Sequence, residues 1–147
     1  MRERRRAGPL TIRLVPASSP EEFETPVLRS RAGKAPNART THLFRAMAGG
    51  VEVALVALDL QDGAGCAILY EIFLSASRRD RGVGTEVLAA AESWAAASGW
   101  GCMEVWPRSL DRGSRSDAHL ASWYGRHGYL AVQTGSERLK KLLPPMR

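Results

Sequence analysis

Residues 72–88 of this chain read IFLSASRRDRGVGTEVL, and this stretch decides the fold. An apolar strand pattern ends in a polar turn with two closely spaced glycines, and an alanine-rich helical pattern follows. Gly82 and Gly84 let the backbone turn tightly and leave its N–H groups uncovered, while the helix start adds the positive end of its dipole. Arg79 and Arg81 add guanidinium groups, which suit phosphate oxygens. The turn therefore predicts a cradle for a pyrophosphate.

Strand and helix patterns extend on both sides of this turn. Strands are expected at residues 10–15, 41–48, 51–60, 66–74, 100–106, 129–134 and 138–143. Helices are expected from residue 18, at 84–98 and at 117–127; Pro26 makes the first one short or broken, and residues 30–40 then form a loop. The order β-α-β-β-β-α-β-α-β-β predicts an α+β domain on a mostly antiparallel sheet.

Length and composition indicate one globular domain. The chain has 147 residues, 44% of them hydrophobic and 24% charged, which excludes wholesale disorder. Residues 1–9 are expected to be a disordered basic tail, and residues 10–147 a single domain. No apolar run approaches the roughly 18 residues of a membrane span, and no secretory signal is recognisable. Cys66 and Cys102 fall in apolar runs and are expected to be buried thiols, so the cytosol is the expected compartment.

The formal charge of +6 raises the question of nucleic acid. Half of the excess lies in residues 1–6, with four arginines and one glutamate, and two further clusters, at 78–81 and 108–115, each carry a net charge of +2. Neither cluster follows an amphipathic helix, and basic loops of this kind suit a phosphate-bearing ligand equally well. Nucleic acid is therefore a partner to consider but is not favoured. The three histidines have no ligand spacing, so no metal is expected.

Two motifs together resemble the acetyl-coenzyme A signature of the GNAT superfamily of N-acetyltransferases. In the first, Leu74 precedes Arg79 by five residues, and Arg79 opens an Arg-x-x-Gly-x-Gly run. In the second, residues 121–129 read ASWYGRHGY, like the family's helix that ends in aromatic-Tyr-x-x-x-Gly-aromatic. The resemblance implies a mixed, mostly antiparallel sheet of six or seven strands with three or four flanking helices. It also implies that the sheet splays between its fourth and fifth strands.

The resemblance places acetyl-coenzyme A in that splay. Pantetheine would bond the backbone of the fourth strand, and the pyrophosphate would rest on the turn and the helix start. The residues that it assigns to the cofactor are Phe73, Leu74, Ala76, Arg79, Arg81, Gly82, Val83, Gly84, Thr85 and Asp117. Asp117 departs from the Asn that many members have there, and Leu120 from a common Ala.

Tyr124 and Glu71 are the candidate catalytic residues. Tyr124 matches the family's general-acid tyrosine, because a tyrosine that titrates near 10 can protonate a thiolate at neutral pH. Its alternative role is a core aromatic. Glu71 is the acid of the strand at 66–74 and lies where diamine acetyltransferases of the family carry one. It either accepts the amine proton through water or is an ordinary solvated acid.

The resulting expectation is an N-acetyltransferase that moves an acetyl group from acetyl-coenzyme A to a primary amine in a ternary complex. The acceptor is a small molecule, a lysine or a protein N-terminus, and the short stretch at 16–40 favours an open site for a bulky acceptor. Two alternatives remain: a catalytically silent acyl-CoA-binding module, and a nucleic-acid-directed modifier or inhibitor. The protein is expected to be a monomer or a homodimer.

Overall fold

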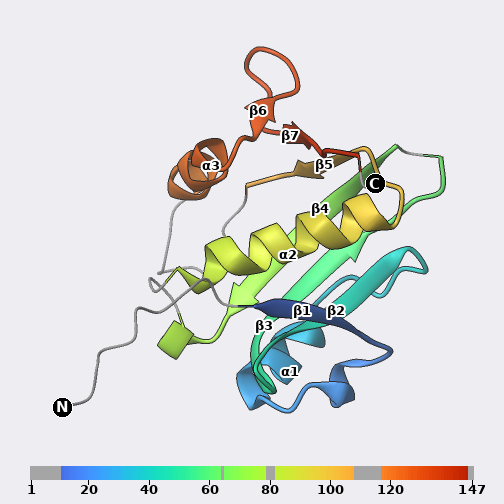
Figure 1. Ribbon diagram of the computed structural model, residues 1–147, viewed down its shortest axis with the longest axis vertical. Coiled ribbons are helices and arrows are strands. Elements are labelled where there is room, and N and C mark those ends of the chain that lie inside the picture. Colours follow the sequence, from blue (N-terminus) through green and yellow to red (C-terminus); the bar gives the residue numbers. More distant parts are fainter. Residues whose placement is uncertain (1–10, 64, 79–81, 108–116, 146–147) are drawn as a thin grey trace.

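A single mixed sheet organises the molecule (Figure 1). The computed structural model describes residues 11–63, 65–78, 82–107 and 117–145. In these ranges seven strands pair in the order β1-β2-β3-β4-β5-β7-β6. Their bounds are β1 Ile12–Ala17, β2 Thr41–Ala48, β3 Val51–Asp59, β4 Cys66–Leu74, β5 Cys102–Val105, β6 Leu130–Ala131 and β7 Leu139–Leu142. The predicted α+β fold and its order of elements are confirmed, and only the β4–β5 pair is parallel within the described ranges.

Three α-helices flank the sheet in the described residues: α1 Pro26–Ala32, α2 Val83–Ala97 and α3 Asp117–Arg126. The prediction was wrong around α1. The residues from Pro20 to Glu22 form only a 3-10 turn, and Pro26 starts the α-helix instead of ending one. Proline suits a first helical position, because the missing N–H has no partner there in any helix. The expected loop at 30–40 consequently begins only after Ala32.

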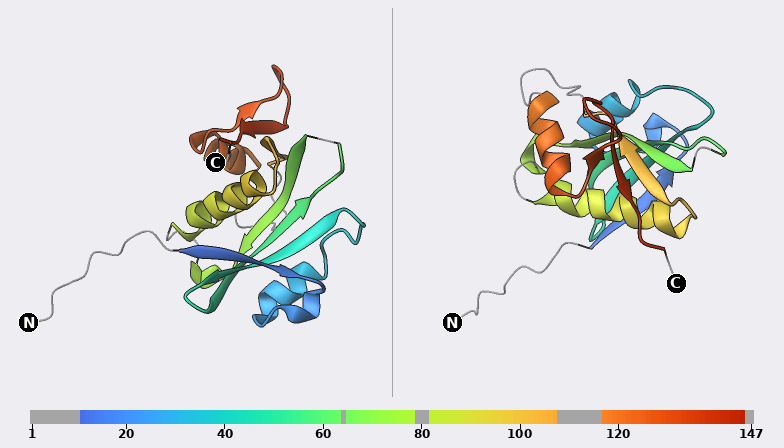
Figure 2. Two further views of the ribbon diagram at one scale, coloured as in Figure 1. Left: turned by 45° about the vertical axis from the view of Figure 1, so that its right-hand side comes forward. Right: turned by 90° about the horizontal axis from the view of Figure 1, so that it is seen from above.

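The helices divide between the two faces of the sheet (Figure 2). The larger core lies between the sheet and the apolar side of α2, and includes Val87, Leu88 and Ala91. The smaller core lies on the opposite face, where α1 contributes Leu28 and Ala32. Because α1 contacts β3 and β4, and Arg31 of this helix bonds Glu71, α1 forms a wall beside the C-terminal part of β4.

The two cysteines form a disulfide, which corrects the expectation of two buried thiols. Cys66 and Cys102 are direct partners in the parallel β4–β5 pair, with their Cα atoms 4.5 Å apart. Each was expected in an apolar strand, but their pairing depends on the strand register, which a single sequence does not show. The bridge joins β4 and β5 at the start of their paired segment. Separately, no helix in the described ranges is long and apolar enough to cross a membrane.

Candidate active site

The sheet opens between β4 and β5. The two strands pair from Cys66–Cys102 to Leu69–Val105, where β5 ends. β4 continues for five more residues, Tyr70 to Leu74, beyond its last pair with β5 (Figure 1). This side of β4 therefore runs past the end of β5 for the last five residues of the strand. This opening is the splay that the family resemblance implies.

A β-bulge in β4 turns Glu71 toward α1. On the neighbouring strand, Ala57 pairs with Glu71 and Leu58 pairs with Leu69, so Tyr70 is the extra residue. In a regular strand Leu69 and Glu71 would share a face, because side chains alternate with a period of two. The bulge breaks this alternation, so Leu69 packs in the α2-side core while Phe73, two residues after Glu71, packs in the α1-side core.

Glu71 is buried and bound to an arginine from α1. Arg31 Nε donates to Glu71 Oε2 at 2.6 Å, and the two side chains are only 15% and 8% exposed. The guanidinium of Arg31 also lies over the ring of Phe73, with its carbon 4.8 Å from the centroid. A carboxylate that is buried needs such a partner, because an isolated buried charge is strongly unfavourable. Glu71 is thus not the solvated acid of the alternative interpretation.

Tyr124 lies close enough to Glu71 to be affected by its charge. The side chain projects from α3 into the larger core and contacts Tyr129 edge-to-face, with centroids 5.4 Å apart. Burial and the negative charge of Glu71 both raise the pKa of Tyr124 above its usual value of 10. The phenol therefore keeps its proton at neutral pH, which is the state that a general acid needs.

The start of α2 has the shape of an anion cradle. Gly82 precedes the helix with φ +77°, a left-handed conformation that glycine adopts without strain, and among the described residues no side chain makes a capping hydrogen bond to the helix start. A Cβ on Gly84 would lie 3.3 Å from Leu74 Cδ1 and 3.6 Å from Trp123 Cζ2, so glycine allows β4, α2 and α3 to meet here. These features fit the pyrophosphate and pantetheine of coenzyme A, with the amides of the helix start beside the part of β4 that extends past β5.

A histidine joins the cradle to the helix that carries Tyr124. His127 Nδ1 lies 2.8 Å from the carbonyl oxygen of Trp123, and His127 Nε2 lies 3.1 Å from Thr85 Oγ1. Because a carbonyl only accepts, Nδ1 carries the hydrogen, and in the neutral ring Nε2 accepts from the Thr85 hydroxyl. The first turn of α2 and the end of α3 are thereby held together across the site.

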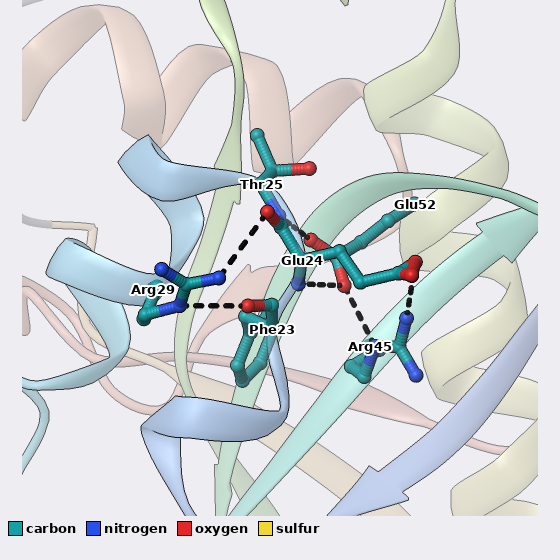
Figure 3. A network of polar contacts seen from close by, with 6 residues as sticks. All are labelled: Phe23, Glu24, Thr25, Arg29, Arg45 and Glu52. Carbon is teal, nitrogen blue, oxygen red and sulfur yellow. Dashed lines mark hydrogen bonds and ion pairs between the residues drawn. The ribbon is translucent and has the colours of Figure 1, made fainter.

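A second buried glutamate, Glu52, anchors the segment that leads into α1 (Figure 3). Glu52 on β3 accepts from the backbone N–H groups of Glu24 and Thr25 at 3.0 and 2.7 Å, and from Arg45 Nε at 2.6 Å. Burial alone would raise the pKa of Glu52, but the two amides and Arg45 outweigh it, so the pKa is lowered. Arg29 closes the network on the helix side by donating to the carbonyl of Phe23 at 2.9 Å.

The predicted site residues gather in one region, with exceptions. Phe73, Leu74, Gly82, Val83, Gly84, Thr85, Glu71 and Tyr124 lie on the adjoining parts of β4, α2 and α3. Arg79 and Arg81 lie outside the described residues, as do the expected tail at 1–9 and the cluster at 108–115. Ala76 begins the 3-10 turn after β4, and Asp117 is exposed at the first residue of α3.

Two residues of this region were missed by the sequence reasoning, Arg31 and His127. His127 stood inside the quoted helix motif, four residues after Trp123, a spacing that brings side chains together on a helix. Arg31 lies in the segment expected to be a loop, so nothing marked it. In the described residues no three His, Cys, Asp or Glu side chains form a group that would hold a metal ion.

Sequence comparison identifies the family. The profile of the acetyltransferase (GNAT) family matches residues 11–129, which is most of the chain. The protein therefore belongs to the GNAT acetyltransferase family, whose chemistry is acyl transfer that depends on acetyl-coenzyme A. A comparison with curated proteins gave no match.

Solved structures share the fold at low sequence identity. An IAA acetyltransferase from Bacillus cereus ATCC 14579 is 16% identical, with a TM-score of 0.62 over 90% of this chain and 100% of its own. A GNAT family acetyltransferase from Elizabethkingia anophelis with acetyl-CoA bound is 12% identical, with a TM-score of 0.61 over 90% and 98%. The chain solved as a KacTA–DNA complex is 13% identical, with a TM-score of 0.63 over 91% and 93%.

Proposed function

We propose that this protein is an N-acetyltransferase that moves the acetyl group of acetyl-coenzyme A to a primary amine by direct attack in a ternary complex. The observation that carries the proposal is the arrangement of Glu71 and Tyr124 at the splayed part of β4, beside the uncapped start of α2. A carboxylate and a protonated phenol that influence each other provide a base and an acid for one reaction centre.

The coenzyme would be held by this chain's backbone and by the helix start. The N–H groups at Gly82 to Thr85 face the pyrophosphate, Phe73 and Leu74 offer strand backbone to pantetheine, and Arg79 and Arg81 would add charge. The same roles are proposed for the backbone at Ala76 and, at the start of α3, for Asp117. When bound, the coenzyme supplies a thioester, which amines attack readily.

Proton transfers complete the reaction. The amine nitrogen forms a bond to the acetyl carbon while the carbon–sulfur bond breaks, the proton of the amine moves to Glu71 directly or through water, and Tyr124 gives its proton to the sulfur. Burial raises the pKa of Tyr124. Burial also raises the pKa of the coenzyme A thiol that leaves in the same place. The pKa values of the phenol and the thiol therefore rise together, and the proton can still pass from Tyr124 to the sulfur.

Tyr124→Phe tests the role of the phenol. We expect kcat to fall by about 10²-fold or more, since a general acid contributes about that factor, with acetyl-coenzyme A affinity near wild type by calorimetry. Tyr129→Phe is the matched control: it removes another buried hydroxyl, whose hydrogen bond goes to Glu92 at 2.7 Å. The control should lose stability but keep kcat. An unchanged kcat in Tyr124→Phe at neutral pH removes this residue as the acid.

Gly82→Glu and Gly82→Ala together test the phosphate cradle. Both place a side chain at φ +77°, so both carry the same backbone strain, about 1–2 kcal/mol. Only the glutamate adds a negative charge at the helix start. We expect calorimetry to show acetyl-coenzyme A binding in Gly82→Ala and no binding in Gly82→Glu. Equal affinities of the two variants would place the phosphates elsewhere.

The alternatives predict different behaviour. A silent acyl-CoA-binding module would bind acetyl-coenzyme A and acetylate no amine. A nucleic-acid-directed protein, a class raised again by the structural likeness to the KacTA chain, would show affinity that falls steeply with salt and with deletion of residues 1–6. We place the protein in the cytosol as a monomer or homodimer, although the Cys66–Cys102 disulfide removes the support that the cysteines gave to that compartment.

A further inference from the structure

Arg31 has hydrogen-bonding capacity that the described fold does not use. Its Nε donates to Glu71, and its guanidinium lies against the face of Phe73. Within the described residues neither of its two Nη groups makes a hydrogen bond, although the side chain is only 15% exposed. A guanidinium fixed at one nitrogen and on one face still presents a planar pair of donors, the geometry that recognises a carboxylate.

The Arg31–Glu71 pair also changes what Glu71 attracts. Arg31 Nε and Glu71 Oε2 are 2.6 Å apart and both side chains are largely buried, so the negative charge of Glu71 is offset by the positive charge of Arg31. A free carboxylate at residue 71 would favour a cationic diamine, whereas here the second ammonium of a diamine would meet the positive charge of Arg31. An acceptor that carries an amine beside a carboxylate would complement both groups, because its carboxylate can meet Arg31 while its amine meets Glu71.

We propose that the acceptor is a free α-amino acid, and that Arg31 selects it by binding its carboxylate while its amine faces Glu71. This inference rests on the proposed acetyl transfer and names the acceptor class for the same site. The sequence favoured two other acceptors: the acid at residue 71 favoured a diamine, and the short segment at 16–40 favoured a bulky acceptor. A free amino acid replaces both. Lysine side chains and N-termini of proteins carry no carboxylate beside the amine.

The placement of Arg31 is fixed by the rest of the fold. The N-terminus of α1 is held by Glu52 through the backbone amides of Glu24 and Thr25, and its apolar side is buried through Leu28 and Ala32. Arg31 therefore meets the acceptor from a rigid helix, with little conformational entropy to lose on binding.

Acceptor pairs that differ only in the carboxylate test this inference. The full-length protein is assayed with acetyl-coenzyme A against the common L-amino acids, their C-terminal amides, and 1,4-diaminobutane, with products identified by mass spectrometry. We expect the best amino acid to exceed its own amide by about ten- to a hundredfold in kcat/KM, the range of a charged hydrogen bond. The diamine should be a poorer substrate than that amino acid.

Variants of Arg31 separate recognition from stability. Because Arg31 also pairs with Glu71, Arg31→Gln should slow every acceptor, but it should lower kcat/KM for the amino acid about ten- to a hundredfold more than for its amide, and increase the relative rate with 1,4-diaminobutane. Arg31→Lys keeps the charge beside Glu71 without the planar fork, and should fall between wild type and Arg31→Gln. Lys34→Gln is the matched control, since it removes an exposed charge three residues away from Arg31. It should leave kcat/KM unchanged for both the amino acid and its amide. Circular dichroism shows which variants are folded.

Binding gives a readout that does not depend on turnover. Calorimetry of the coenzyme A-loaded protein with the same amino acid and amide should show tighter binding of the acid in wild type, and equal binding in Arg31→Gln. Equal use and binding of acid and amide by wild type, or an equal loss of both in folded Arg31 variants, overturns the inference. Acid-selective binding without acetylation of any amine would refute the proposed function while leaving the recognition by Arg31 intact.

Discussion

Two buried glutamates, Glu52 and Glu71, lie in similar settings and differ in what surrounds them. Each is under 10% exposed, and each accepts a hydrogen bond from an arginine Nε at 2.6 Å. Glu52 additionally accepts from two backbone amides, and its arginine, Arg45, also binds Glu24 at 3.1 Å. The Glu52 network thus joins β2, β3 and the segment that leads into α1 (Figure 3).

The arginine of Glu71 differs from that of Glu52 in how many of its donors the described fold uses. Arg31 has two Nη groups with no hydrogen bond in the described part of the chain, and the charge of Glu71 raises the pKa of a buried tyrosine. Glu71 also follows a bulge on the strand that separates from its neighbour. The difference indicates that a buried ion pair tied into further backbone and side-chain hydrogen bonds supports the fold, whereas one whose arginine has both Nη groups spare, beside the opening of the sheet, supports binding and chemistry.

Glu52→Ala is the strongest test of the supporting role. Removing this carboxylate leaves Arg45 and two amides without their acceptor, and breaking a buried charged pair costs about 3–5 kcal/mol. We expect the free energy of unfolding, measured in urea, to fall by about that amount. Glu21→Ala, which removes an exposed acid near α1, should change it by less than about 0.5 kcal/mol. Similar values for the two variants would show that Glu52 does not anchor α1.

Glu71→Gln should lower activity more than stability, whereas Glu52→Ala should mainly lower stability. The amide still offers an oxygen to Arg31, so unfolding free energy should fall by clearly less than in Glu52→Ala. As a loss of the general base, the change should lower kcat/KM by about 10²-fold. The pH optimum should move upward, because the proton of the amine must then leave to solvent hydroxide. Asp62→Asn, in the β3–β4 turn, is the control, and an unchanged pH–rate profile in Glu71→Gln would leave Glu71 without a proton-transfer role.

The sequence predicted the parts of this comparison that depend on neighbouring residues. The turn at Gly82 and Gly84 is read from local backbone requirements, and Tyr124 stands at a fixed spacing within one helix. Both needed only a short window of sequence, and β2 and β4 were predicted with their observed bounds.

The parts that the sequence did not predict depend on register between distant segments. Arg31 and Glu71 are forty residues apart, and they meet only because the bulge at Tyr70 turns Glu71 toward α1. Cys66 and Cys102 likewise form a disulfide because β4 and β5 pair in one particular register. No propensity or spacing in a single chain encodes these pairings, because each is set by the packing of several elements at once.

The smallest expected effect concerns the pH dependence of stability. The pKa of Glu52 is lower in the folded protein than its ordinary value near 4.3, so its ionised form stabilises the fold. That contribution is complete above the unfolded pKa and is lost as the pH falls through the folded one, at about 1.4 kcal/mol for each unit of the shift. We expect urea unfolding of wild type to weaken from about pH 5 downward, and the difference from Glu52→Gln to shrink over the same interval. A difference that stays constant from pH 6 to pH 3 would mean that Glu52 supports the fold through packing alone, and the contrast with Glu71 would then rest on hydrogen-bond geometry and not on charge.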